Sequence, residues 1–124
     1  MKKHRILIID DDKISCRLIR MALEELGYPS PDVALSGIEA LNILENQAYD
    51  LILLDNRMPG MTGVDFLKIF STSRFRKNTK VLLVTAEIRK NIELDINKAN
   101  ISIDGILSKP FNISGLLSAI SDVL

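Results

Sequence analysis

The chain has 124 residues, of which 47% are hydrophobic and 26% charged, and its 16 basic and 16 acidic side chains cancel. This size and composition predict one globular domain over residues 1–124 with a hydrophobic core of its own. The balanced charge does not favour a nucleic-acid or membrane-surface protein. No apolar run approaches the roughly 20 residues that cross a bilayer, and the basic start lacks a signal-peptide pattern. A cytoplasmic protein is therefore expected.

Short apolar runs alternate with segments of helical period, which is the pattern of a parallel α/β sheet. Strands are predicted at residues 5–9, 31–36, 49–55, 80–85 and 103–108. Helices are predicted at residues 13–26 and 36–46, from residue 64, at 88–99, and after residue 112. A (β/α)8 barrel needs roughly 250 residues, so five such units favour an open, doubly wound sheet.

The helices carry predicted caps and apolar faces. Asp12 and Asn112 are the predicted N-caps of the first and last helices, and Gly27 is the predicted C-terminal stop of the first. Cys16, the single cysteine, excludes an internal disulfide and is interpreted as a small helix residue rather than a reactive thiol. The residues expected to face inward are Ile14, Leu18, Ile19, Ala22, Leu23 and Leu26; Ile38, Leu41 and Leu44; Ile88, Ile92, Ile96 and Ala99; and Ile113, Leu116, Leu117 and Ile120.

Polar residues gather where the predicted strands end. Asp10 and Asp11 follow the first strand, Asp55 ends the third, Thr85 ends the fourth, and Lys109 follows the fifth. In open α/β sheets, ligands bind beyond the carboxyl ends of the strands. Each of these residues has an ordinary structural explanation by itself, but their convergence on one edge favours a common site.

Three carboxylates, a hydroxyl and an ammonium group favour metal-assisted phosphoryl transfer. Clustered carboxylates suit Mg²⁺, with Mn²⁺ as an alternative, and the ion would neutralise the repulsion within the run of aspartates. An aspartate can itself be the nucleophile and form an aspartyl-phosphate. A lysine and a hydroxyl nearby would then hold the added phosphoryl oxygens.

The segments IIDDD, DLILLDNRMPGMTG, VLLVTAE and SKPF complete the pattern. In their order and near-spacing they resemble the receiver domain of two-component response regulators, most closely the single-domain chemotaxis type. The resemblance covers the whole chain and implies a flavodoxin-like (βα)5 fold with strand order 2-1-3-4-5. It also implies a signalling phosphoacceptor rather than an enzyme, one that changes conformation on phosphorylation and binds or releases a partner or output domain.

By the same resemblance, Asp55 is the phosphoacceptor. Asp10 and Asp11 correspond to the acidic pair that holds Mg²⁺, together with Asp55 and the backbone carbonyl of Arg57. Thr85 corresponds to the switch hydroxyl that moves towards the phosphoryl group.

Lys109 corresponds to the lysine that pairs with a phosphoryl oxygen, and Pro110 follows it where the family usually has a cis peptide bond. Ile106 departs from the family, which has Tyr or Phe there, so activation is expected to couple through Thr85 and the fourth helix. Arg57 and Glu87 occupy positions that flank the phosphoryl group. We hypothesise that they form an ion pair that screens the site from water.

The implied phosphoryl donor is a sensor histidine kinase or a phosphotransfer protein. The face around the fourth helix and fifth strand is the implied contact for a downstream target. His4 is interpreted as a solvated terminal residue, and the basic stretch 73–80 as a solvated connector, so no direct contact with nucleic acid or membrane is expected. A start at Met1 and an end in the last helix favour a stand-alone regulator.

Three alternatives stay open. A phosphorylation-independent pseudo-receiver would keep the fold as an interaction module. A haloacid-dehalogenase-type phosphatase also uses an Asp nucleophile and Mg²⁺, but places the nucleophile after its first strand. An FMN carrier would share the fold, but the chain lacks a Ser-, Thr- and Gly-rich loop after the first strand and contains no Trp.

Overall fold

The computed structural model describes residues 4–124, so the predictions that rest on Met1 and the basic start fall partly outside the described residues. The strands are β1 (Ile6–Ile9), β2 (Asp32–Ala34), β3 (Leu51–Leu54), β4 (Lys80–Thr85) and β5 (Gly105–Ser108). The helices are α1 (Lys13–Glu25), α2 (Gly37–Leu44), α3 (Gly63–Phe70), α4 (Arg89–Ala99) and α5 (Ile113–Val123), with a 3₁₀ turn at Arg76–Asn78. Every predicted element is present, and no predicted end is displaced by more than two residues.

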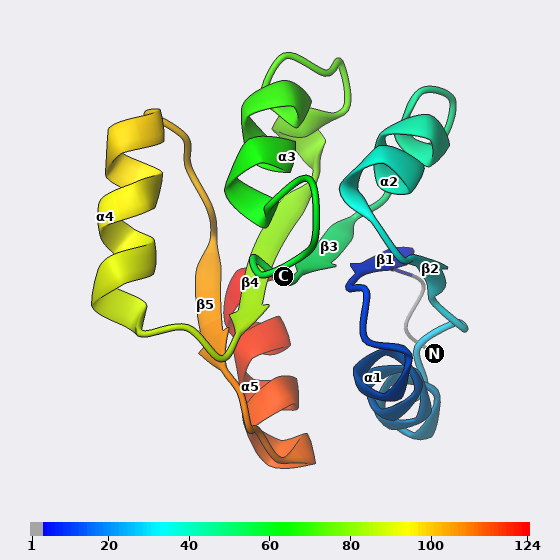
Figure 1. The fold of residues 1–124 in the computed structure, drawn as a ribbon. Coiled ribbons are helices and arrows are strands. Elements are labelled where there is room, and N and C mark those ends of the chain that lie inside the picture. The colour runs from blue at the N-terminus through cyan, green and yellow to red at the C-terminus, as the bar shows by residue number, and fades with distance from the viewer. Residues whose placement is uncertain (1–3) are drawn as a thin grey trace.

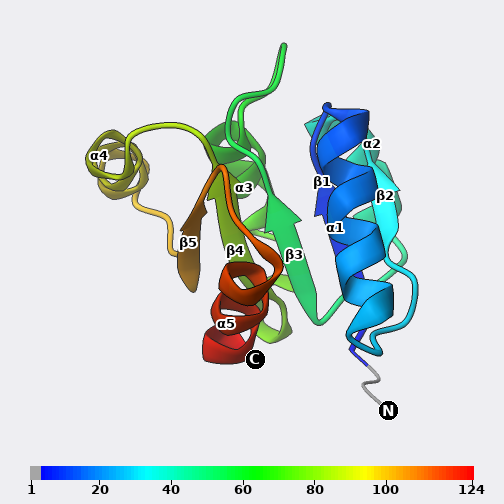
Figure 2. The same cartoon turned by 90° about the horizontal axis from the view of Figure 1, so that it is seen from below.

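The five strands form one parallel sheet in the order β2-β1-β3-β4-β5, which confirms the expected doubly wound fold. Helices α1 and α5 cover one face of the sheet and α2, α3 and α4 cover the other (Figure 1). Figure 2 looks onto the face that α1 and α5 cover. In the sheet Ile9 lies opposite Leu54, and Leu54 opposite Leu83, so the carboxyl ends of the central strands are level.

A hydrophobic core lies on each face of the sheet. Strands β1 and β3 are buried along their whole length, as expected for strands covered on both faces. On one face Phe66 and Phe70 of α3 stack with their ring centroids 5.5 Å apart. On the other face Leu23 of α1 and Leu116 of α5 are fully buried.

The predicted inward faces of the helices are partly wrong. Five residues expected to face inward are exposed: Ile14 (72%), Leu18 (59%), Ile38 (62%), Ile88 (69%) and Ile113 (52%). All but Leu18 lie at the start of their helices: Ile14, Ile38 and Ile113 in the first turn, and Ile88 at the N-cap of α4.

Leu18 is exposed for a different reason. Residues four apart on a helix are offset by about 40° around its axis, so a row at this spacing drifts off the buried face. The buried face of α1 instead consists of Cys16, Ile19, Ala22 and Leu23.

The predicted caps are confirmed. The Asp12 carboxylate accepts a hydrogen bond from the backbone N–H of Ile14 at 3.0 Å, and Asn112 caps α5 in the same way through Gly115 at 2.7 Å. Gly27 follows α1 with φ at 88°, a left-handed conformation that glycine adopts without a steric cost. Within residues 4–124, the helices are too short or too polar to cross a membrane.

The connector at residues 73–80 is more than a solvated loop. Arg76 donates to the backbone carbonyls of Thr79 and Ser102, both at 2.8 Å. The guanidinium therefore ties the start of β4 to the segment before β5, and this part of the basic stretch is structural.

Candidate functional site

Backbone hydrogen bonds continue the sheet past the strand ends and fix the site residues. The N–H of Asp55 donates to the carbonyl of Ile9 at 2.9 Å, which places Asp55 beside the first residue after β1. The N–H of Lys109 donates to the carbonyl of Thr85, also at 2.9 Å. The predicted residues are therefore brought together by the register of four parallel strands.

Asp10, Asp11 and Asp55 each offer a carboxylate oxygen within 4.8 Å of the others. Asp10 is 2% exposed and Asp55 is 8% exposed, whereas Asp11 faces solvent. Asp12 lies outside this cluster, because its carboxylate caps α1 and accepts from the Ser15 hydroxyl at 3.1 Å. The structure thus separates the run of three aspartates into two cluster members and one cap.

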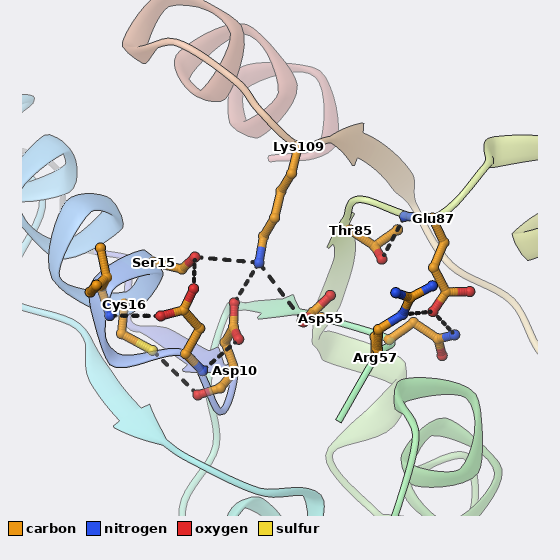
Figure 3. A network of polar contacts seen from close by, with 11 residues as sticks. Asp10, Ser15, Cys16, Asp55, Arg57, Thr85, Glu87 and Lys109 are labelled. Atoms are coloured by element: carbon orange, nitrogen blue, oxygen red, sulfur yellow. Dashed lines mark hydrogen bonds and ion pairs between the residues drawn. The ribbon is translucent and has the colours of Figure 1, made fainter. Parts of the chain in front are cut away.

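The ammonium group of Lys109 neutralises part of this charge. Its Nζ donates to Asp10 Oδ2 at 2.7 Å and lies 3.8 Å from Asp55 Oδ2, with Ser15 Oγ at 3.5 Å (Figure 3). Burial by itself would lower the pKa of Lys109, but the hydrogen bond that its ammonium group donates to Asp10 and the charges of Asp55 and Asp10 outweigh burial and raise the pKa. Lys109 is therefore a fixed cation.

Asp55 has a raised pKa. Burial is the main cause and the charge of Asp10 adds to it, while Lys109, the Thr85 hydroxyl and the backbone of Arg57 oppose it. Three carboxylates and one ammonium group leave a net charge of about minus two at the site at neutral pH. This excess charge and the oxygen-only donor set fit a divalent cation such as Mg²⁺.

The raised pKa of Asp55 predicts how stability depends on pH. In metal-free buffer at pH 7, the free energy of unfolding of Asp55→Asn should exceed that of the wild type by about 1–2 kcal/mol. The variant should therefore unfold at a higher urea concentration. A raised folded-state pKa means that stability is lost as pH rises through that pKa and regained as pH falls. The difference should therefore stay constant above the folded-state pKa of Asp55 and shrink as the pH falls through it towards the ordinary range of a carboxyl group. Urea unfolding of both proteins measures it, and a gap that widens at low pH would contradict the assignment.

Thr85, Arg57 and Glu87 complete the far side of the site. Thr85 is buried, and its Oγ1 accepts from the backbone N–H of Glu87 at 3.3 Å. Arg57 Nε lies 3.9 Å from Glu87 Oε1, so the hypothesised ion pair is present. The Arg57 side chain is 82% exposed, and contacts of this length in solvent contribute little.

The remaining predicted positions also lie near this edge. The Lys109–Pro110 peptide bond is cis, as the resemblance implied. Ile106 is half-buried on β5 and packs against the core on the α2–α4 side of the sheet.

Two neighbours of the site, Asn56 and Ser15, are not among the residues predicted from the sequence. Asn56 is 5% exposed and donates through Nδ2 to Glu87 Oε1 at 3.0 Å. Its sequence position indicates a place at the site, because Asn56 is a polar residue that directly follows an apolar strand and Asp55. Ser15 lies one helical turn beyond Asp12, at a spacing that predicts contact with the cap.

A pocket of about 290 Å³ lies at the carboxyl edge of the sheet. Its lining consists of Asp11, Asp12, Ser15, Asp55, Arg57, Thr85, Ala86, Glu87 and Lys109. The pocket places a buried carboxylate beside a cation and a hydroxyl, a set of groups that is suited to phosphoryl transfer.

Comparison with known proteins decides the family. The model of the response regulator receiver domain matches residues 6–121. The chain belongs to the response regulator receiver family. This receiver is 34% identical over 115 residues to the chemotaxis protein CheY-3 of Vibrio cholerae, covering 93% of this chain and 87% of that protein. Receivers of this kind serve in signal transduction.

Solved receivers have the same fold. CheY4 of Vibrio cholerae superposes with a TM-score of 0.88 at 29% identity, covering 99% of this chain and all 100% of that one. The response regulator TrrA of Thermotoga maritima, solved in complex with Mg²⁺-BeF, gives a TM-score of 0.82 at 31% identity, with 100% of both chains covered. The fold and the family expected from the sequence are thus confirmed.

Proposed function

We propose that this receiver, over residues 1–124, accepts a phosphoryl group on Asp55 in a Mg²⁺-dependent reaction and signals by changing conformation. The observation that carries the proposal is the placement of Asp55, a buried carboxylate with a raised pKa that lies 3.8 Å from Lys109 Nζ and within 4.8 Å of Asp10 and Asp11. A purely structural site would not need so much uncompensated negative charge.

The chain's own groups divide the work of transfer. An oxygen of Asp55 forms a bond to phosphorus while the bond to the donor breaks, and the donor leaves with that electron pair. Lys109 is already held between Asp10 and Asp55, so a short movement takes its ammonium group to a phosphoryl oxygen. The Thr85 hydroxyl is proposed to donate to another.

Asp10, Asp11, Asp55 and the backbone carbonyl of Arg57 are the proposed ligands of Mg²⁺. When bound, the ion would neutralise the carboxylates and the charge on the incoming phosphoryl oxygens. The Mg²⁺-BeF complex of TrrA supports binding of Mg²⁺ by this receiver through similarity. Mn²⁺ satisfies the same oxygen donors and is the proposed substitute.

Phosphorylation is proposed to reach a downstream target through α4 and β5. Movement of Thr85 towards the phosphoryl group would alter the loop that leads to α4, because Thr85 Oγ1 accepts from the backbone of Glu87. Ile106 on the neighbouring strand would then repack, without the aromatic side chain that the family usually has there.

The phosphoryl donor, a histidine kinase or a phosphotransfer protein, is proposed to dock beside the site on α1 and α5. An apolar groove of about 1020 Å³ lies between them, lined in part by Leu18, Met21 and Ile113. Ser15 and Lys109 line both this groove and the phosphorylation pocket, so a protein seated in the groove lies next to Asp55.

Leu18→Glu tests this docking surface. Leu18 is 59% exposed, so the variant should fold, but a charge buried in an apolar interface should slow phosphoryl transfer from the donor protein about tenfold. Phosphorylation by a small-molecule donor should be unchanged. Ile69→Glu is the matched control, because Ile69 is 50% exposed on α3 at the opposite face. Equal slowing of both variants would contradict the proposal.

The function itself is tested by incubation with acetyl phosphate and Mg²⁺, followed by intact-protein mass measurement. One phosphoryl adduct is expected for the wild type and none for Asp55→Asn. No adduct on either protein would favour the pseudo-receiver. Repeated turnover of a small phosphate ester would instead favour the phosphatase.

A further inference from the structure

Asn56 is fixed rigidly beside the phosphorylation pocket. Its Oδ1 accepts from the backbone N–H of Val64 at 2.9 Å, and its backbone carbonyl accepts from Gly63 N–H at 2.9 Å. A side chain at Gly63 would meet the backbone of Asp55 and Asn56 at 2.8 Å and 2.9 Å, so α3 begins in close contact with this segment. Asn56 therefore has little freedom to move.

The free end of the Asn56 amide holds Glu87. Its Nδ2 donates to Glu87 Oε1 at 3.0 Å, and the same oxygen lies 3.9 Å from Arg57 Nε. The Asn56 bond is short, partly buried and made to a charged acceptor, which is the stronger kind of hydrogen bond. The Arg57 contact is long and largely solvated, which is the weaker kind of ion pair. Asn56, rather than Arg57, therefore determines where the Glu87 carboxylate lies.

We propose that Asn56 is a positioning residue that sets the lifetime of the phosphoryl group through Glu87. This inference rests on the proposed phosphorylation of Asp55. In the loss reaction the oxygen of a water bonds to phosphorus and the bond from phosphorus to the Asp55 oxygen breaks. The electron pair returns to the carboxylate, and the proton of the water leaves with inorganic phosphate. Glu87 and Arg57 line the pocket that this water must enter, and Asn56 keeps Glu87 in place there.

The variant Asn56→Asp distinguishes the roles of the two amide atoms, the oxygen that accepts from Val64 and the nitrogen that donates to Glu87. The introduced carboxylate has the same shape and still accepts from Val64 N–H, so the start of α3 is retained. It loses the donor and repels Glu87, which should leave its present position. The rate of phosphoryl loss, followed by mass after removal of acetyl phosphate, should rise about three- to tenfold.

Asn56→Asp combined with Glu87→Gln is the decisive variant. It reverses the polarity of the hydrogen bond, because the new amide can donate to the new carboxylate, and it keeps one carboxylate in the pair. The loss rate should return to within about twofold of the wild type. Glu87→Gln alone completes the cycle.

The outcomes separate the two proposals. A faster loss in Asn56→Asp that the combined variant reverses supports the inference. An unchanged rate in Asn56→Asp, or an effect that persists in the combined variant, overturns it while phosphorylation of Asp55 stands. No adduct on the wild type overturns the proposed function, and this inference with it.

Discussion

Addition of Mg²⁺ is expected to raise the melting temperature of the protein, and Asp10→Asn with Asp11→Asn should abolish the rise. The three clustered carboxylates share one lysine, so the metal-free site holds excess negative charge that a divalent ion relieves. At a hundred times its Kd, a ligand of the folded state stabilises by about 2.7 kcal/mol. For a domain of this size the melting temperature should rise by roughly 10 °C.

Asp12→Asn is the matched control for that experiment. Asp12 is adjacent in sequence but caps α1, and asparagine is an equally good N-cap. The control should keep both its stability and its response to Mg²⁺. A similar rise in the variant that lacks Asp10 and Asp11 would mean that the ion binds elsewhere.

Lys109→Met is expected to destabilise the metal-free protein and to slow phosphorylation. The substitution keeps the length of the side chain but leaves Asp10, whose side chain is 3% exposed, without its ion-pair partner. Removing one partner of a buried pair costs about 3–5 kcal/mol. Loss of a cation that holds a developing phosphoryl charge should also slow uptake from acetyl phosphate by about a hundredfold.

The control for Lys109 is Lys80→Met. Lys80 Nζ lies 4.0 Å from Asp104 Oδ1, and the two side chains are 53% and 29% exposed. An exposed pair of this kind contributes about 1 kcal/mol or less. Urea unfolding with EDTA measures both costs. Equal costs would contradict a special role for Lys109 at the site.

The fold and most of the site follow from local features of the sequence. Apolar runs and helical periods gave the order of the elements, because each depends on residues close together in the chain. The placement of Asp10, Asp55 and Lys109 followed from topology, since residues after parallel strands in one register share an edge.

The features that were not predicted depend on contacts between distant segments. The bond between Asn56 and Glu87 joins residues 31 positions apart, across the connections that follow β3 and β4. Spacing along the chain carries no information about such a pair. The hypothesised Arg57–Glu87 pair is present, but it is long and exposed. The position of Glu87 therefore depends more on its hydrogen bond with Asn56. Likewise, Ile14 and Ile113 fit the helical period but are exposed in the first turns of α1 and α5, because burial there depends on tertiary packing rather than on the period.

Peptide mass mapping of the protein after treatment with acetyl phosphate tests the central claim most directly. With Mg²⁺ present, we predict one phosphoryl group on the peptide that contains Asp55. When EDTA replaces Mg²⁺ during the treatment, much less of this adduct should form. A phosphoryl group on a different residue, or equal uptake with and without the ion, would contradict the account.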